Sequence, residues 1–396
     1  MYIRGLETKI TETLQRGKSL LILGPRQVGK TTLLRELSTD LSIDLSINRV
    51  RQNYERDPSV IIEEIQALKK KCPLVAIDEI QKVPQLMDDI QYLVDNKKAQ
   101  FILTGSSARK LTHSGVVNLL PGRLVQLRMD PLSLTEAPAV SLTDLLVYGS
   151  LPGILTVKDP KHREEDLASY VETYLEEEIR KEAVTRNMGD FNRFLECAAI
   201  ESGQVVNLTR LSQDLGPTVP TISNYYQALV DTLIAERIEP LTQSTTRKKL
   251  LKSPRYLFFD LGVRRSCARE GPKLNREHLG KIFEQWVGLE CLRYLRLNEP
   301  RGKILFWSDP DGPEVDWVVE VGKRYLPIEV KYSTNPNKRD AKHLETFLDE
   351  YKGRCSVALI VSQVERSRQV SERVRAVPWQ NLDQELFDWL GQGDSL

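Results

Sequence analysis

Residues 19–32, Ser-Leu-Leu-Ile-Leu-Gly-Pro-Arg-Gln-Val-Gly-Lys-Thr-Thr, decide the fold of the N-terminal part of the chain. The apolar residues Leu20 to Leu23 predict a short buried strand, and residues 24–31 fit G-x-x-x-x-G-K-[ST] at every fixed position. The glycines of this pattern let backbone N–H groups curl around phosphates, and the following helix points its positive N-terminus at them. The stretch therefore predicts a strand that runs into a phosphate-binding loop.

The residues of this loop have distinct expected roles. Lys30 should reach the β- and γ-phosphates, and the Thr31 hydroxyl should bind Mg²⁺. The expected cofactors are therefore ATP and Mg²⁺. The residues expected to bind the nucleotide are Gly24, Pro25, Arg26, Gln27, Val28, Gly29, Lys30, Thr31 and Thr32.

A second apolar run, Leu74 to Ile77, ends in two carboxylates, Asp78 and Glu79. After a phosphate loop, this pattern predicts a strand that brings one carboxylate near the metal and the next near the attacking water. We expect Asp78 to hold Mg²⁺ through a water molecule and Glu79 to polarise the nucleophilic water. The two motifs together predict a nucleotide hydrolase.

The first part of the chain alternates strands with helices, which predicts an α/β fold with a doubly wound parallel sheet. Ligands bind at the carboxyl ends of such strands, and Thr104 ends the strand predicted at 100–104. Thr104 is expected to sense the γ-phosphate and to orient the water. A neighbouring serine, or a simple turn after the strand, remains an alternative. Further helices are expected at 6–17, 32–38, 60–71 and 87–94, and a weak strand at 41–45.

Length and composition limit the remaining possibilities. The 396 residues suggest two or three domains, and 56 Lys and Arg against 55 Asp and Glu give no overall charge that would indicate nucleic acid. The five cysteines include no C-x-x-C pair, which argues against a zinc site or a disulfide framework and fits a reducing compartment. Because no apolar run approaches 18 residues and no signal peptide is present, we expect a cytoplasmic protein without a membrane segment.

Two arginines after the third strand are candidates for an arginine finger, which would stabilise transition-state charge across a subunit interface. Arg109 lies in Ser-Ala-Arg-Lys and Arg123 in Leu-Pro-Gly-Arg. Either residue is also compatible with an ordinary surface position. The residues alone do not separate these alternatives.

Several motifs resemble those of the prokaryotic AAA-type ATPases that are fused to a C-terminal domain of unknown function. The resemblance implies an AAA+ fold that works as a ring or dimer, and it favours Arg123 as the finger. It covers nearly the whole chain. The motifs that carry it lie at residues 24–32, 77–81, 103–107, 120–123, 130–136, 148–153 and 252–260.

The middle of the chain predicts helices that end in a winged helix. Helices are expected at 207–216 and 221–233, followed by strands at 234–238 and 256–259, which is a DNA-binding layout. The turn and the start of the second helix, residues 217–224, contain no Lys or Arg, so a role in packing or assembly is an equal alternative. If DNA is bound here, we expect the basic wing to bind it. The basic residues of the wing are Arg247, Lys248, Lys249 and Lys252.

The last third of the chain carries a second candidate site. Glu284 lies in a helix predicted from residue 279, Asp316 in a strand at 314–320, and Glu329 and Lys331 in a strand at 326–332. The alternation of a strand places Glu329 and Lys331 on one face. The pattern resembles the PD-(D/E)xK nuclease fold.

In such a site the three carboxylates Glu284, Asp316 and Glu329 would hold Mg²⁺, with Lys331 steadying the water or the transition state. The alternative is a nuclease-like fold that does not cut, in which the carboxylates and Lys331 form a cluster of ion pairs. The segment lacks the Gln-x-x-x-Tyr motif of the RecB-type branch, which argues against a processive exonuclease.

We therefore predict an AAA+ P-loop ATPase core at 1–130, a helical and winged-helix region at 131–262, and a PD-(D/E)xK nuclease-like α/β domain at 263–396. The preferred function is ATP-driven handling of DNA, with metal-dependent cleavage by Glu284, Asp316, Glu329 and Lys331 as its extension. The alternative is a nucleotide-dependent switch that binds a protein partner and carries an inactive nuclease-like domain.

Overall fold

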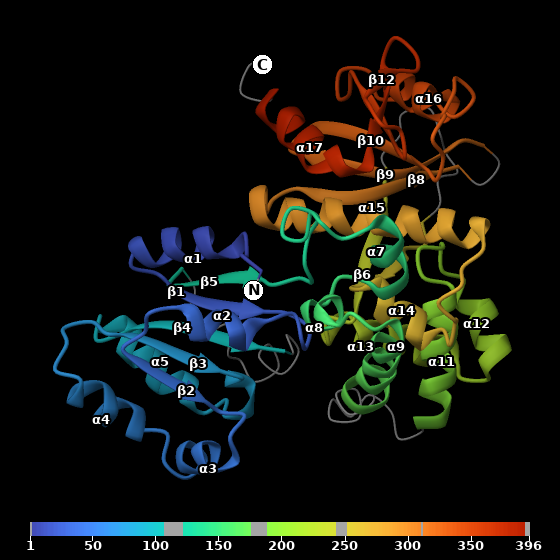
Figure 1. Cartoon of the computed structure of the whole chain (residues 1–396). Helices are drawn as coiled ribbons and strands as arrows, with labels where there is room; N and C mark the ends of the chain where they lie inside the picture. Colours follow the sequence, from blue (N-terminus) through green and yellow to red (C-terminus); the bar gives the residue numbers. More distant parts are fainter. Residues whose placement is uncertain (1, 107–121, 176–187, 243–251, 310–311, 393–396) are drawn as a thin grey trace.

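The N-terminal unit is built around a five-stranded parallel sheet with the strand order β2-β3-β4-β1-β5 (Figure 1). The structure, a computed structural model, describes residues 2–106, 122–175, 188–242, 252–309 and 312–392. The strands of this sheet are β1 (Ser19–Leu23), β2 (Leu41–Asp44), β3 (Leu74–Asp78), β4 (Gln100–Gly105) and β5 (Leu124–Arg128). Every neighbouring pair is parallel, which confirms the predicted α/β fold class.

Helices cover both faces of this sheet because side chains alternate along its buried strands. Leu20 and Ile22 of β1 face the core that includes α1 and α2, whereas Leu21 and Leu23 face the core that includes α4 and α5. The helices are α1 (Leu6–Gln15), α2 (Lys30–Glu36), α3 (Asn48–Arg56), α4 (Val60–Ala67), the 3-10 turn η1 (Ile80–Lys82) and α5 (Leu86–Asp95). Sequence analysis predicted neither α3 nor β5, and it placed the end of α4 four residues too late.

The middle region is mainly helical. The helix predicted from Thr221 begins at Val219, because Pro220 is well suited to a first helical turn. Its elements are α7 (Leu142–Tyr148), α8 (Pro152–Thr156), α9 (Pro160–Ser169), the π-helix η3 (Tyr170–Leu175), α11 (Met188–Ile200), α12 (Leu208–Leu215), α13 (Val219–Asp231) and α14 (Leu261–Cys267). The order α12, α13, β6, β7 is the predicted helix–turn–helix with a two-stranded wing.

The wing is continuous with the C-terminal sheet. Strands β6 (Ala235–Pro240) and β7 (Arg255–Phe258) are antiparallel, and β6 also pairs with β8 (Lys303–Ser308). The result is an eight-stranded sheet with the order β12-β13-β11-β10-β9-β8-β6-β7, so it runs across the predicted boundary at 262. Its other strands are β9 (Glu314–Val321), β10 (Arg324–Lys331), β11 (Ala358–Ser362), β12 (Arg368–Gln369) and β13 (Val374–Pro378).

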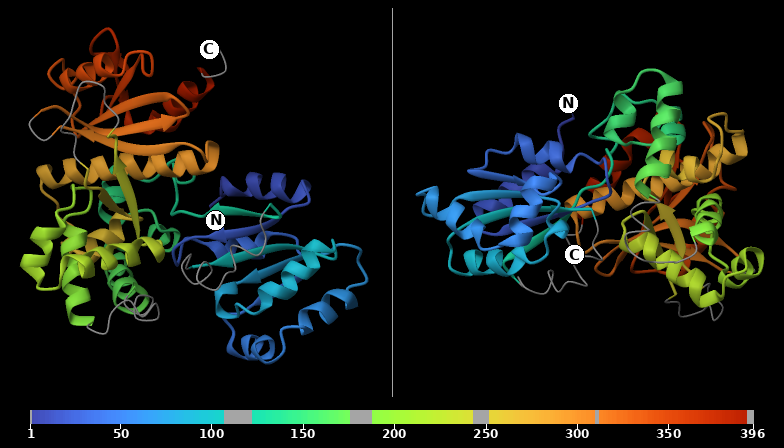
Figure 2. Two further views of the ribbon diagram at one scale, coloured as in Figure 1. Left: turned by 180° about the vertical axis from the view of Figure 1, so that it is seen from behind. Right: turned by 90° about the horizontal axis from the view of Figure 1, so that it is seen from below.

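One long helix, α15 (Arg276–Asn298), lies between the middle region and the C-terminal sheet (Figures 1 and 2). Phe283 and Trp286 of α15 share a core with Ile328 and Val330 of β10. Helix α17 (Leu382–Gly391), which follows the turn η4 (Trp379–Asn381), covers the same face, and α16 (Lys342–Glu350) covers the opposite face. None of the described helices is both long and apolar enough to cross a membrane.

Candidate functional site

The predicted phosphate loop connects β1 to α2 and is folded around its lysine. Lys30 is the first residue of α2, only 5% exposed, and its Nζ donates to the carbonyl oxygens of Gly24 and Pro25 at 2.8 Å each. Gly29 precedes it with φ of 104°, a conformation that favours glycine. A Cβ on Gly24 would overlap the carbonyl oxygen of Met129, so only glycine fits there.

Three elements bring the predicted catalytic residues of this unit together. The Thr31 hydroxyl of α2 donates to Asp78 Oδ2 at 2.6 Å, and the Thr104 hydroxyl of β4 donates to Asp78 Oδ1. The backbone N–H of Glu79 donates to Thr104 Oγ1 at 3.1 Å. The carboxyl ends of β3 and β4 therefore meet the start of α2, at the edge of the sheet where sequence analysis expected a ligand to bind. The hydroxyl–carboxylate pair has the oxygen donors that Mg²⁺ binds in nucleotide sites, so these residues fit the expected cofactors.

The carboxylate of Glu79 is held by two residues that sequence analysis did not single out. Gln81 Nε2 donates to Glu79 Oε2, and the Ser106 hydroxyl lies 3.3 Å from the same oxygen. Glu79 itself adopts a left-handed backbone conformation, with φ of 60° and ψ of 45°. Non-glycine residues adopt this conformation at an energetic cost, and such strain is concentrated at functional sites. The motif Asp-Glu-Ile-Gln contained Gln81, but its spacing gave no sign of the contact.

Residues outside the motif also hold the phosphate loop. Arg4 Nη1 donates to the carbonyl oxygen of Val28 at 2.8 Å, and the Tyr170 hydroxyl donates to that of Arg26 at 3.4 Å. The other predicted nucleotide-binding residues are Pro25 and Gln27 within the loop and the exposed Thr32 in α2. The loop is thus braced both by the N-terminus and by the middle region.

Burial dominates the electrostatics of this site. It lowers the pKa of Lys30 to about 8, although the carboxylates of Glu79 and Asp78 act in the opposite direction. Two further cations, Arg128 and Arg26, lie near enough to lower the same pKa. A lysine surrounded by loop carbonyls and extra positive charge fits a site that receives a polyanion.

The predicted arginine finger lies away from this edge of the sheet. Arg123 immediately precedes β5, and its carbonyl oxygen accepts from the Ser19 N–H at the start of β1, so it lies at the end opposite to the phosphate loop. Its side chain is half exposed and pairs with Asp95. Any action on a nucleotide would have to be on a neighbouring copy. The other candidate, Arg109, lies outside the described residues.

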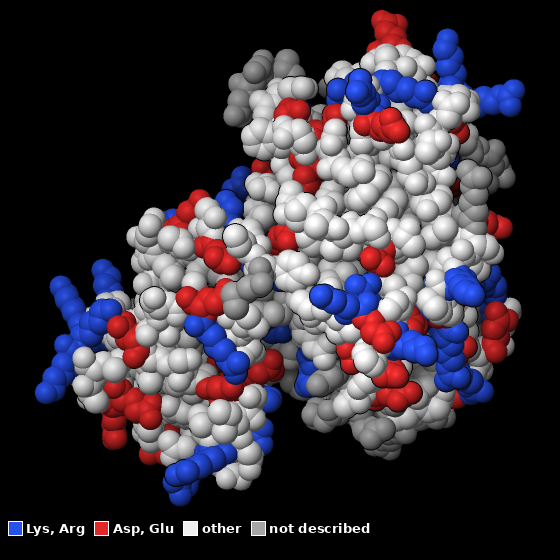
Figure 3. All heavy atoms as spheres, viewed as in Figure 1, with Lys and Arg blue, Asp and Glu red and all other residues white. Residues whose placement is uncertain are grey.

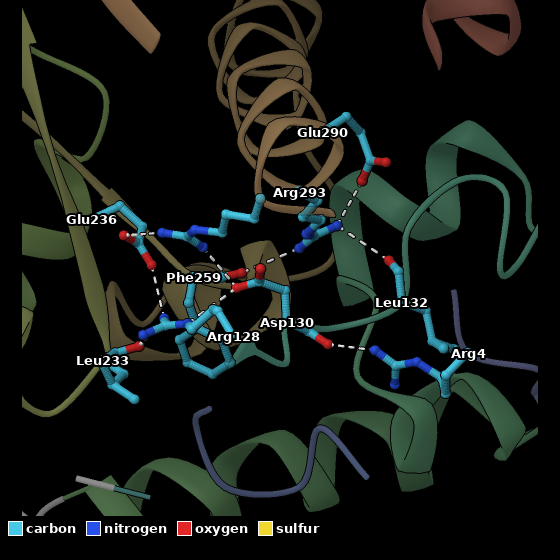
Figure 4. A network of polar contacts seen from close by, with 10 residues as sticks. Arg4, Arg128, Asp130, Leu132, Leu233, Glu236, Phe259, Glu290 and Arg293 are labelled. Carbon is cyan, nitrogen blue, oxygen red and sulfur yellow. Dashed lines mark hydrogen bonds and ion pairs between the residues drawn. The ribbon is translucent and has the colours of Figure 1, made fainter. Parts of the chain in front are cut away.

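A partly buried network of ion pairs joins the end of β5 to α15 (Figure 4). Arg128 contacts both Asp130 and Glu236, and Arg296 of α15 contacts the same two carboxylates, at 2.8 Å for Asp130. Burial alone would raise the pKa of Asp130, but the surrounding arginines outweigh it and lower that pKa to about 2.

Arg293 extends the network in α15. Its guanidinium pairs with Glu290 at 2.6 Å and donates to the carbonyl oxygens of Leu132 and Phe259. On the other side, Arg4 donates to the carbonyl oxygen of Asp130 at 2.6 Å (Figure 4). Because Arg4 also holds the phosphate loop, the loop and α15 are connected through a few direct contacts.

The residues of the second predicted site come from α15 and from strands β9 and β10. Lys331 Nζ contacts Glu329 Oε1 at 2.6 Å, which confirms that the two side chains share a face. Asp316 Oδ2 accepts from the Val330 N–H at 2.8 Å. Glu284 of α15 is paired with Arg255 of β7 at 3.0 Å, a contact that sequence analysis did not predict.

The three carboxylates influence one another strongly. Burial, followed by the charge of Asp316, raises the pKa of both Glu284 and Glu329 to about 8. Burial also raises the pKa of Asp316, against the effects of Lys331 and Arg255. Over the described part of the chain, however, no three His, Cys, Asp or Glu side chains are arranged to hold a metal ion. The carboxylates are near enough to influence one another, but each has a different partner.

The predicted winged helix presents a neutral helix. The described turn and helix at 216–231 contain no Lys or Arg, as the sequence indicated. Of the predicted basic wing, Lys252 is described and exposed, whereas Arg247, Lys248 and Lys249 lie outside the described residues.

Comparisons with known proteins agree with this organisation. Residues 16–137 match the family of AAA domains. Residues 140–273 and 279–382 match two domains of unknown function, DUF8612 and DUF4143. The chain is thus similar to AAA domains in its N-terminal part and to two domains of unknown function in the rest.

Two curated relatives cover most of the chain. It is 26% identical to Uncharacterized protein Rv2008c of Mycobacterium tuberculosis over 341 residues, which are 84% of this chain and 75% of the relative. The same values hold for Uncharacterized protein Mb2031c of Mycobacterium bovis.

Solved structures are similar only at a coarse level. The Orc1 protein of Aeropyrum pernix in complex with DNA is 11% identical with a TM-score of 0.29, over 68% of this chain and 93% of that one. Can2 of Sulfobacillus thermosulfidooxidans in complex with cyclic tetra-adenylate is 12% identical with a TM-score of 0.23, over 98% and 99% of the two chains. Similarities with TM-scores this low do not indicate a function for this chain.

Proposed function

We propose that the chain is an ATP hydrolase that acts on DNA, with a nuclease-like C-terminal site under its control. The observation that supports ATP hydrolysis is that the hydroxyls of Thr31 and Thr104 both contact Asp78, beside Lys30 and Glu79. Mg²⁺, when bound, would neutralise phosphate charge there. Lys30 and the loop N–H groups would bind the phosphates, and Glu79 would take a proton from the attacking water.

Different residues hold the backbone and the carboxylate of Glu79. Thr104 fixes the backbone N–H of Glu79, while Gln81 and Ser106 hold its carboxylate. A general base must be held within hydrogen-bond reach of the water that it activates. We expect ATP hydrolysis to require Lys30, Thr31, Asp78 and Glu79, and to slow when Thr104 is replaced.

The proposed action on DNA is supported by positive charge beside the second site. β10 ends at Lys331, and the following residues include the exposed Lys338, Arg339 and Lys342. The loop that contains the exposed Arg366 lies against this segment, because Arg368 Nη2 donates to the carbonyl oxygen of Pro336 at 2.6 Å. Figure 3 shows Lys and Arg side chains gathered over the region of α16 and β12. Clustered cations of this kind bind the phosphate backbone of nucleic acids.

The experiment that tests this proposal measures ATP hydrolysis with and without single-stranded, duplex and branched DNA. We expect DNA to change the hydrolysis rate, and Lys30→Ala to abolish it. Mg²⁺- or Mn²⁺-dependent cleavage of the same DNAs, compared between the wild type, Asp316→Ala and Lys331→Ala, tests the nuclease-like site. A protein that binds none of these DNAs, and whose hydrolysis ignores them, would refute the proposal.

A second candidate function is a nucleotide-dependent switch that binds a protein partner. The ion pair between Arg255 and Glu284 favours it, because the pair engages a carboxylate that cleavage would need. The absence of Lys and Arg from residues 216–231 also favours it. Sedimentation of the full chain with and without ATP would test the proposed ring or dimer, and Arg123→Ala would test the finger in that assembly.

A further inference from the structure

We propose that Arg255 is the resident cation of the acidic cluster Glu284, Asp316 and Glu329, and that it keeps a divalent metal out of this cluster. This inference rests on the proposed function, because it concerns the regulation of the same C-terminal site. Arg255 does not belong to the predicted nuclease-like motif. It is supplied by β7, the second strand of the wing.

The guanidinium of Arg255 is built into the site. Its Nη1 contacts Glu284 Oε1 at 3.0 Å and donates to the carbonyl oxygen of Asp316 at 3.4 Å. The guanidinium carbon lies 4.4 Å from the ring centre of Phe306 and 5.5 Å from that of Trp317. Only 8% of the side chain is exposed. Aromatic faces stabilise a desolvated cation, so the position is suited to a permanent positive charge.

Each carboxylate of the cluster is turned to a partner of its own. Glu284 faces Arg255, Glu329 faces Lys331, and Asp316 accepts from the Val330 N–H. A hard divalent cation needs several carboxylate oxygens that converge on one point. In the part of the chain that the structure describes, no such group of three is formed. Arg255 and Lys331 therefore each occupy a carboxylate that a metal would otherwise need.

Two buried atoms indicate that this arrangement is not the only one the cluster supports. Glu329 Oε2 and Arg255 Nε have no hydrogen-bond partner, and both residues are more than nine-tenths buried. A purely structural ion-pair cluster normally satisfies its polar atoms, because an unsatisfied buried polar atom is destabilising. The Oε2 atom of Glu329 is therefore free to bind a cation when Arg255 no longer pairs with Glu284.

The position of Arg255 also makes it removable without dismantling the sheet. β7 is the outermost strand of the eight-stranded sheet, and Arg255 is its first residue. The three carboxylates lie on α15, β9 and β10, and β9 pairs directly with β10, whereas Leu257 of β7 shares the core beneath α15. Withdrawal of one edge-strand side chain would leave the three carboxylates in place.

The test is calorimetric titration of the full chain with Mn²⁺ alone, without nucleotide. Arg255→Met places an unbranched apolar side chain beside the two aromatic rings and removes the charge, whereas Arg255→Lys keeps the charge. We expect Arg255→Met to bind Mn²⁺ at least tenfold more tightly than the wild type, and the added Asp316→Asn to abolish that gain. Arg255→Lys should behave as the wild type does.

If Arg255→Met does not fold, Mn²⁺ binding by the wild type and by Asp316→Asn still tests the inference. Binding of Mn²⁺ by the wild type that Asp316→Asn removes would overturn the inference, as would an Arg255→Met protein whose Mn²⁺ affinity is unchanged. Neither result depends on DNA. Failure of the proposed function would appear separately, as ATP hydrolysis that no DNA affects.

Discussion

Replacement of Asp130 by Asn tests the junction between the N-terminal unit and α15. The Asp130 carboxylate accepts hydrogen bonds from Arg296 and Arg128. The positive charge of these arginines lowers the pKa of Asp130 from 3.8 to about 2. A difference of about 1.8 units, at about 1.4 kcal/mol per unit, corresponds to about 2.5 kcal/mol at neutral pH. Both guanidinium groups donate to Asp130 Oδ1, so an Asn amide could still accept from them through its own oxygen but would remove the negative charge that stabilises them.

Hydrogen exchange measures this loss where it occurs. A local destabilisation of about 2.5 kcal/mol corresponds to about 70-fold faster exchange of protected amides. We expect this acceleration in β5 and in the last turns of α15, near Arg296. Local exchange is preferable to a single unfolding transition, because a chain of several domains need not unfold in two states.

The matched control is Asp95→Asn, since Asp95 pairs with Arg123 on the surface. Exposed pairs contribute about 0.2–1 kcal/mol, so exchange near Asp95 should change only a few-fold. The stabilisation by Asp130 is present above pH 4 and lost as the pH falls toward 2, because its pKa is lowered in the fold. If Asp130→Asn and Asp95→Asn accelerated hydrogen exchange equally, this reasoning would be refuted. It would also be refuted if Asp130→Asn still exchanged faster than the wild type at pH 2.

Three further predictions concern other parts of the chain. Thr31→Ala should lower ATP hydrolysis at least 100-fold in a phosphate-release assay, and near-normal turnover would contradict the assigned role. Gly149→Ala should destabilise the protein by about 3 kcal/mol in thermal unfolding, since φ is 73° and the new Cβ would overlap Asp260, whereas Gly153→Ala, with open space around it, should be harmless. Burial, followed by Glu290, raises the pKa of Asp383 to about 7, so stability should fall by about 1 kcal/mol per unit as the pH rises from 4 to 7. Melting at pH 5 and pH 8 should show that Asp383→Asn flattens this dependence, and an unchanged slope would count against it.

The proximity of Thr31, Asp78 and Thr104 was predictable because a parallel sheet gathers the carboxyl ends of its strands at one edge. Thr31 follows the phosphate loop directly, and Asp78 and Thr104 end neighbouring strands of a parallel sheet, so the strand order alone brings them together. The contacts of Gln81 and Ser106 with Glu79 were not predictable. They depend on the left-handed backbone of Glu79 and on how the turn after β3 lies against β4.

The second site shows the same limit. A strand period of two predicted that Glu329 and Lys331 share a face, and they do. Nothing in that pattern predicted Arg255, which lies 29 residues before Glu284 and 61 before Asp316. Its place in the cluster follows from the pairing of β6 with β8, which joins the wing to the C-terminal sheet. Such long-range pairing has no periodic signature in the sequence.

Helix α15 places the two halves of the molecule on one rigid element. Glu284, in its first half, faces Arg255, whereas Arg296, near its end, faces Asp130. At a rise of about 1.5 Å per residue, these two positions are about 18 Å apart along one helix. The Glu284–Arg255 contact is 3.0 Å long, so a shift of α15 by about 1 Å relative to β7 would take it beyond hydrogen-bond distance. Packed helices shift by about 1–2 Å in known switching transitions. A movement of the N-terminal unit that pulled on Asp130 would therefore need to shift α15 by only about 1 Å. Such a shift would separate Glu284 of the acidic cluster from Arg255.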